Sequence, residues 1–215
     1  MSNNESFIDE VNEEVRRDQL FGYFRKYGWL AVAAVVVLVG AAAWTEYQRA
    51  KERAAAEETG DAIIEALSLD APQDVLAALE GLTPNAVTLM LAASAAQEAG
   101  DVDGAIQILN KVAAGEDFSQ LYKELATLKI VSLSEGKTSV EERLELLRPL
   151  AEAGRPFALL AKEQIAMVQI ESGDKVAALD TLGEILKDAA VTQGLRDRSQ
   201  QMIVALGGDL ETLSN

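Results

Sequence analysis

The sequence predicts an all-α protein in which one N-terminal transmembrane helix is followed by an α-solenoid. Strand-like alternation of polar and apolar residues is absent, and aromatic residues make up only 5% of the 215 positions. Sheets favour aromatic and β-branched residues, whereas the abundant alanine suits closely packed helices. An uncharged run occupies residues 27–45, and glycines recur at a nearly constant spacing in the second half of the chain.

Residues 1–26 form a short acidic segment before the uncharged run. Ser6 and Asp9 fit a capping box, and Val11 and Val15 have the spacing of one helix face. A short, partly ordered cytoplasmic helix is therefore one interpretation of this segment. A solvated tail is the other, and the sequence favours neither.

Residues 27–45 are predicted to cross a membrane as a helix. Such a helix is about 28 Å long, close to the ~30 Å hydrocarbon core of a bilayer. Trp29 and Trp44 bracket the run where aromatic rings settle at the headgroup levels, and Val36 lies near its centre. A buried helix of a globular protein would carry a polar stripe, which this run lacks.

The predicted anchor is expected to stay uncleaved, with the N-terminus in the cytoplasm. Residues 41–43 resemble a signal-peptide cleavage site, but the preceding segment is longer and more acidic than a signal peptide allows. The charge bias across the run is a weak guide to orientation. Long domains also translocate largely regardless of their charge. The basic residues near the two ends are Arg16, Arg17, Arg25 and Lys26 before the run, and Arg49, Lys51 and Arg53 after it.

Residues 46–81 are predicted to form membrane-proximal helices. Ala, Glu, Lys and Arg dominate the first part, which only Gly60 interrupts. Pro72 then breaks this helix, and a short second helix occupies residues 73–80.

Residues 82–215 are predicted to form helical repeats. Gly100, Gly136, Gly173 and Gly207 recur at spacings of 36, 37 and 34 residues. A glycine at such a position ends a helix in the left-handed conformation, which is costly for other residues. Amphipathic runs lie on both sides of the glycines, and a period of this length with two helices per unit is typical of an α-solenoid.

Two stretches, AGDVDGAIQIL at residues 99–109 and SGDKVAALDTL at 172–182, resemble the turn and second helix of tetratricopeptide (TPR) repeats. The resemblance implies degenerate repeats, three or four in number, because the large aromatics are missing and Glu141 stands where the unit after Gly136 should carry alanine. It implies roles for two groups of residues. The repeat turns are Gly100, Asp101, Gly136, Gly173 and Asp174, and the small packing residues are Ala93, Ala105, Ala166 and Ala178.

The whole organisation is similar to the bacterial ancillary subunit of the Sec translocon. The similarity rests on the acidic N-terminus, the run FGYFRKYGWLAVAAVVVLVGAAAW, the helix after it and the degenerate repeats. It implies a single-pass protein of the bacterial inner membrane with its repeat domain in the periplasm. The implied partners are the SecYEG channel and a periplasmic chaperone or isomerase.

The composition argues against several kinds of chemistry. The chain has neither cysteine nor histidine and a formal charge of −16, which disfavours thiol chemistry, common zinc sites and nucleic-acid binding. Gly136–Lys137–Thr138 lacks the first glycine of a phosphate-binding loop, and Asp101 and Asp103 lack the distal glutamate of a calcium loop. We therefore expect no enzyme activity, cofactor, metal or small-molecule substrate.

The sequence thus favours a membrane-anchored scaffold that binds protein partners, accessory to the Sec translocon and periplasmic folding factors during export. An alternative is an envelope scaffold of another complex, such as the cell-wall or division machinery. An anchored hydrolase that uses carboxylates is a more remote alternative. The residues themselves name neither the partner nor the face that binds it.

Overall fold

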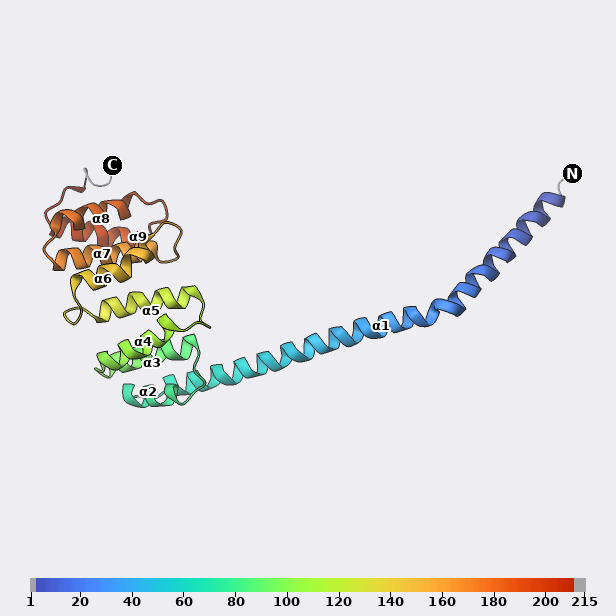
Figure 1. The fold of residues 1–215 in the computed structure, drawn as a ribbon, viewed down its shortest axis with the longest axis horizontal. Coiled ribbons are helices and arrows are strands. Elements are labelled where there is room, and N and C mark those ends of the chain that lie inside the picture. Colours follow the sequence, from blue (N-terminus) through green and yellow to red (C-terminus); the bar gives the residue numbers. More distant parts are fainter. Residues whose placement is uncertain (1–2, 211–215) are drawn as a thin grey trace. The chain divides into compact units, whose positions relative to one another are not determined.

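The structure is a computed structural model that describes residues 3–210, with the side chains of residues 29–210 except residue 31. Within this part the chain is helical and has no strand, which confirms the all-α class (Figure 1). A single 3₁₀ turn, η1 (Arg148–Ala151), follows α6. The α-helices are α1 (Asn3–Leu67), α2 (Pro72–Glu80), α3 (Ala86–Glu98), α4 (Val102–Ala114), α5 (Gln120–Leu133), α6 (Val140–Leu147), α7 (Ala158–Glu171), α8 (Lys175–Lys187) and α9 (Gln193–Ala205).

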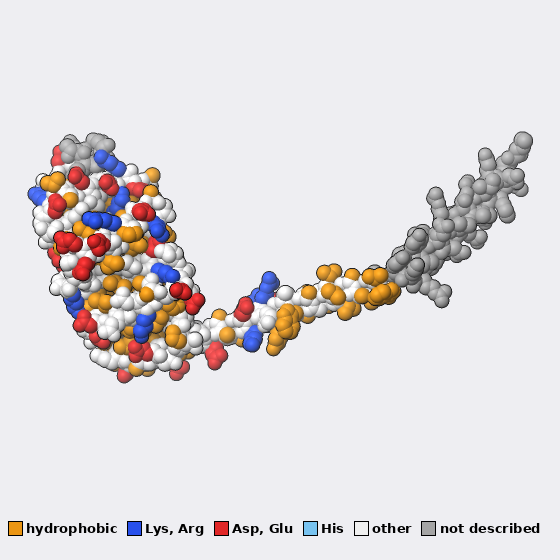
Figure 2. All heavy atoms as spheres, viewed as in Figure 1, with side chains coloured by type: hydrophobic (Ala, Val, Ile, Leu, Met, Phe, Trp, Pro, Cys, Tyr) orange, Lys and Arg blue, Asp and Glu red, His pale blue; other side chains and the backbone are white. Residues whose placement is uncertain are grey.

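The chain divides into two units, unit 1 (Met1–Gly60) and unit 2 (Asp61–Asn215). The described part of unit 1 is a stretch of α1. Its described side chains are exposed along the helix (Figure 2). The residues predicted to anchor the chain in a membrane lie here. Trp29, Val36 and Trp44 are 68%, 64% and 64% exposed.

The prediction of a transmembrane helix at residues 27–45 is contradicted. No helix in the described part of the chain is long and apolar enough to cross a membrane. From Glu46 onward α1 is rich in charged residues. The side chains of residues 27 and 28 lie outside the described residues.

The same finding corrects two further predictions. The fold class is all-α, but the N-terminal transmembrane helix that formed part of it is not supported. The predicted single-pass localisation in the inner membrane, with a periplasmic C-terminal domain, is overturned as well.

The hydrophobic core of unit 2 consists of three clusters arranged along the chain. The first joins the end of α1 to α2, α3, α4 and part of α5; the second joins α5, α6, η1 and α7; the third joins α7, α8 and α9. Ala126 and Ile130 of α5 belong to the first cluster, whereas Leu128 and Val131 belong to the second. Because successive helical residues point about 100° apart, one helix can contribute to two cores on opposite faces.

Packing between helices follows chain order. The main contacts join α2 to α3, α3 to α4, α4 to α5, α7 to α8 and α8 to α9. Figure 1 shows α3 beside α4 and α7 beside α8. This pattern, in which each element packs mainly on its neighbours in sequence, is characteristic of solenoid architectures.

Side-chain caps account for several helix starts in unit 2. Asn85 accepts hydrogen bonds from the backbone N–H groups of Val87 and Thr88, and its own N–H donates to the Thr88 hydroxyl. Ser139 and Glu142 form the same reciprocal arrangement at the start of α6. Such caps satisfy the N–H groups that the first turn of a helix leaves without a partner.

Candidate functional site

The glycines that the sequence assigned to repeat turns lie at the ends of helices. Gly100, Gly136 and Gly173 have φ of 84°, 69° and 82°, the left-handed conformation predicted for them, and Gly207 has φ of 71°. After Gly100, the N–H of Asp101 donates to the carbonyl of Ala96 at 2.9 Å. This bond from the second residue after the C-cap residue Ala99 defines a Schellman motif.

The Gly100 and Gly173 turns are equivalent in detail. After Gly173, the N–H of Asp174 donates to the carbonyl of Gln169, also at 2.9 Å. Each aspartate then caps the next helix: Asp101 accepts from the N–H of Gly104, and Asp174 from the N–H of Ala177. The two aspartates therefore start helices.

The four alanines predicted to be small packing residues are buried. Ala105, Ala166 and Ala178 are 0% exposed and Ala93 is 2% exposed. Ala93 of α3 and Ala105 of α4 have the same spacing from Gly100 as Ala166 of α7 and Ala178 of α8 have from Gly173. These residues hold the two helix pairs together and do not converge on a site.

The turn at Gly136 differs from the other two. The N–H groups of Lys137 and Thr138 both donate to the carbonyl of Ser134 at 3.0 Å, and Lys137 forms an ion pair with Asp103 at 2.6 Å. The helix that follows, α6, has only 8 residues and ends in η1. The regular pairing of helices is therefore interrupted here.

A cavity of about 120 Å³ lies where α5, α6 and α7 meet, next to this interruption. We call it the α5–α7 cavity. Valine and methionine side chains form its apolar side, and carboxylate, amide, hydroxyl and guanidinium groups form its polar side. Its lining residues are Val131, Ser132, Glu135, Arg143, Gln164, Met167, Val168 and Glu171.

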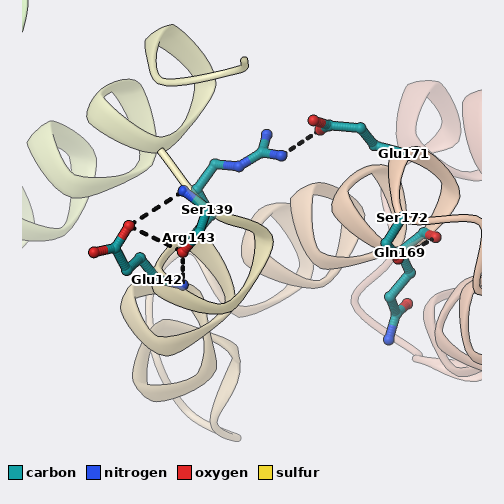
Figure 3. Close-up of polar contacts among 6 residues, drawn as sticks. All are labelled: Ser139, Glu142, Arg143, Gln169, Glu171 and Ser172. Atoms are coloured by element: carbon teal, nitrogen blue, oxygen red, sulfur yellow. Dashed lines mark hydrogen bonds and ion pairs between the residues drawn. The ribbon is translucent and has the colours of Figure 1, made fainter. Parts of the chain in front are cut away.

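Arg143 is the buried cation of the α5–α7 cavity. Its spacing from Val140 and Leu147 places it on the same face of α6 as these residues, and its side chain is 4% exposed. Figure 3 shows the guanidinium group extending from α6 toward Glu171 on α7, with which it forms an ion pair. Glu142, on the other side of α6, turns back to Ser139. The capping box thus fixes the helix that carries Arg143.

Two residues that line the cavity each have a buried polar atom with no hydrogen-bond partner in the described residues. They are Nε of Arg143, a donor, and Oε1 of Gln164, an acceptor. A buried polar group that lacks a partner costs roughly 1–3 kcal/mol. Such atoms are uncommon in folded proteins, and each one calls for an explanation such as a bound water or ion, a catalytic role or strain.

A second buried ion pair connects α5 to the segment before α7. Glu124 is 1% exposed, and its Oε1 accepts hydrogen bonds from Nη1 of Arg155 at 2.9 Å and from Nε2 of Gln120 at 3.2 Å. Its Oε2 has no partner in the described residues. Polar contacts of Glu124 therefore help to hold α5 against the segment before α7, in addition to the second hydrophobic cluster.

A larger hollow of about 610 Å³ lies between the segments that precede α7 and α9. Its two basic residues are already paired, Arg155 with Glu124 and Lys162 with Glu184. The carboxylate of its acidic residue, Asp188, accepts from the N–H of Ala190. Because these charges have partners, this hollow is a weaker candidate than the α5–α7 cavity.

One basic group in the described residues has a clearly altered pKa. The pKa of Arg198 is raised above its usual value because Nε and Nη2 donate to Glu163, whose negative charge adds to the effect. This pair joins α9 to α7 and is structural. The described part of the chain contains no cluster of three or more acidic side chains placed to hold a metal ion.

Sequence reasoning did not find the α5–α7 cavity, although one pattern pointed to it. Val140, Arg143 and Leu147 share a helix face by their spacing of three and four residues. A charged residue on an otherwise apolar face predicts a buried cation that needs a partner. Nothing in the sequence, however, paired Arg143 with Glu171, which lies 28 residues further along the chain.

Comparison with known proteins gives one match. Residues 5–206 match a family model described as "Protein of unknown function (DUF2659)". No curated protein and no solved structure matches the chain. Because the matched region covers most of the sequence, the chain belongs to the DUF2659 family of proteins.

Proposed function

We propose that this protein is a non-catalytic helical scaffold that binds a polypeptide partner at the α5–α7 cavity. The observation that carries the proposal is the cavity itself, a side-chain-sized space beside two buried polar atoms without partners. The adjoining surface adds an apolar contact, because Met167 is 54% exposed. Solenoids commonly bind other molecules on extended concave surfaces formed by their repeats.

The test compares two variants in cells that naturally contain the protein. Met167→Arg places a positive charge at the cavity, whereas Val176→Arg places the same charge on α8, where Val176 is 73% exposed and does not line the cavity. After crosslinking and purification of the full chain, we expect partners of the wild type to be retained by Val176→Arg and lost by Met167→Arg. Equal recovery by both variants would refute the proposed site.

The identity of the partner is a separate proposal. The sequence resemblance makes the SecYEG channel and a chaperone or isomerase the first candidates, and the family match neither supports nor opposes them. Their presence among the proteins lost by Met167→Arg would support this assignment. Turnover of a substrate by the purified chain, abolished by changing a single acidic residue, would instead favour the hydrolase alternative.

A further inference from the structure

We propose that the α5–α7 cavity binds the basic side chain of the partner polypeptide, a lysine or an arginine. This inference rests on the proposed function and names the chemistry of what enters the site. Three properties of the cavity lead to it: its size, its charge and its unpartnered atoms.

The size of the cavity matches a single side chain. An apolar cavity of about 150 Å³ accommodates a benzene molecule, so about 120 Å³ has room for one extended side chain rather than for a longer peptide segment. Val131, Met167 and Val168 line it with apolar atoms. Long basic side chains bury their methylene groups against such atoms and keep the charged end in a polar environment.

The charge of the cavity favours a cation. Glu171 is already paired with Arg143, so these two charges offset each other. Glu135 is exposed and forms no ion pair among the described residues, which leaves the cavity with one unbalanced negative charge. An incoming carboxylate would be repelled by Glu135, whereas an ammonium or guanidinium group would be attracted. The formal charge of −16 on the whole chain acts in the same direction.

The unpartnered atoms of the lining residues also favour a cation. Gln164 lines the cavity and has a buried Oε1 acceptor without a partner in the described residues. An ammonium or guanidinium group has hydrogen-bond donors for such an acceptor and no acceptor of its own. That a polypeptide supplies this cation follows from the proposed function.

Peptide pools provide a direct test with the full-length protein. The pools contain acetylated and amidated decapeptides with random sequences and one central position fixed as lysine, norleucine or glutamate. Peptides captured by the immobilised protein are quantified by mass spectrometry. The matched variants are Glu135→Gln at the cavity and Glu141→Gln on the exposed surface of α6, which change the net charge equally.

We expect the wild type and Glu141→Gln to retain lysine peptides about 1.5- to fivefold better than norleucine peptides, the range of an exposed ion pair. Glu135→Gln should reduce this ratio to near one. Equal ratios for the two glutamine variants, preference for the glutamate pool or no capture from any pool would each overturn the inference. If Met167→Arg still abolishes partner capture in that case, the proposed function stands. If Met167→Arg captures the same partners as the wild type, the proposed function fails as well.

Discussion

At the scale of single residues, the conformation of Gly173 determines where α7 ends and α8 begins. Its φ of 82° is left-handed, and a Cβ added there would meet no other atom within 4 Å. A substitution at this position therefore tests backbone conformation alone. The same is true of Gly100 in the equivalent turn.

We expect Gly173→Ala to destabilise unit 2 by about 1–2 kcal/mol, the cost of the left-handed conformation for an L-residue. Gly173→Asn should cost less, because asparagine tolerates this conformation better. Urea unfolding followed by circular dichroism measures both. Gly194→Ala in the first turn of α9 is the control, since its φ is ordinary and its nearest neighbour is 3.7 Å away. A loss as large in the control would exclude the conformational explanation.

The buried carboxylate of Glu124 gives a second prediction at this scale. Removing Arg155, which is 38% exposed, leaves this charge without its partner and should destabilise the protein by about 2–3 kcal/mol. The double change Glu124→Gln and Arg155→Ala removes the buried charge and should recover most of this loss. A double-mutant cycle of unfolding free energies measures the coupling. Simple additivity of the two single changes would show that the pair is not coupled.

At the scale of helices, the capping box of α6 supports the residue most important for the cavity. The hydroxyl of Ser139 accepts from the N–H of Glu142, and the Glu142 carboxylate accepts from the N–H of Ser139 (Figure 3). Because α6 has only 8 residues, it has few other backbone bonds to hold it. The cap therefore contributes to the position of Arg143.

We expect Ser139→Ala to cost about 1 kcal/mol of stability, the usual cost of losing an N-cap. Ser119→Ala is the matched control, since Ser119 precedes α5 without making a side-chain cap. Amide hydrogen exchange resolved by peptide should rise in α6 for Ser139→Ala and stay unchanged for Ser119→Ala. Equal exchange in the two variants would mean that the cap does not hold α6.

The helices differ in how well the sequence predicted them. Local patterns were sufficient for the Gly–Asp turns, because the glycine conformation and the aspartate cap depend on neighbouring residues. The buried face of Ile108, Leu109 and Val112 likewise followed from spacing within one helix. The short α6 and the following η1 were not predicted, because their boundaries depend on packing against α7.

The candidate site was harder to predict for the same reason. Its lining residues come from three helices, and each has an ordinary role when considered alone.

The predicted transmembrane helix failed differently. The prediction rested on the uncharged composition of one run, whereas the described stretch of α1 is not long and apolar enough to cross a membrane. Residues 3–26 of the acidic segment form the first part of α1, in line with the helical interpretation, and their side chains lie outside the described residues.

At the scale of the whole molecule, the division of the core into three clusters predicts local rather than uniform responses to mutation. Leu109 in the first cluster and Leu182 in the third occupy equivalent positions and are 1% and 0% exposed. In a solenoid, each repeat is stabilised mainly by its neighbours, so damage remains close to its source.

We expect Leu109→Ala and Leu182→Ala to lose about 2–5 kcal/mol each through lost burial and cavity formation. Hydrogen exchange should increase in α3 and α4 for the first variant and in α8 and α9 for the second. Both measurements use the full chain. A uniform increase across unit 2 in either variant would indicate a single cooperative core.

The placement of the aromatic residues gives the two units separate optical signals. Both tryptophans of the chain, Trp29 and Trp44, lie in α1 within unit 1, whereas the aromatic residues of unit 2 are Tyr122, Phe118 and Phe157. Tryptophan emission therefore reports the surroundings of α1 and is insensitive to the folding of the repeats. A partner that shifts this emission has contacted α1. A partner that leaves the emission unchanged but slows amide exchange in α5, α6 and α7 has bound at the cavity.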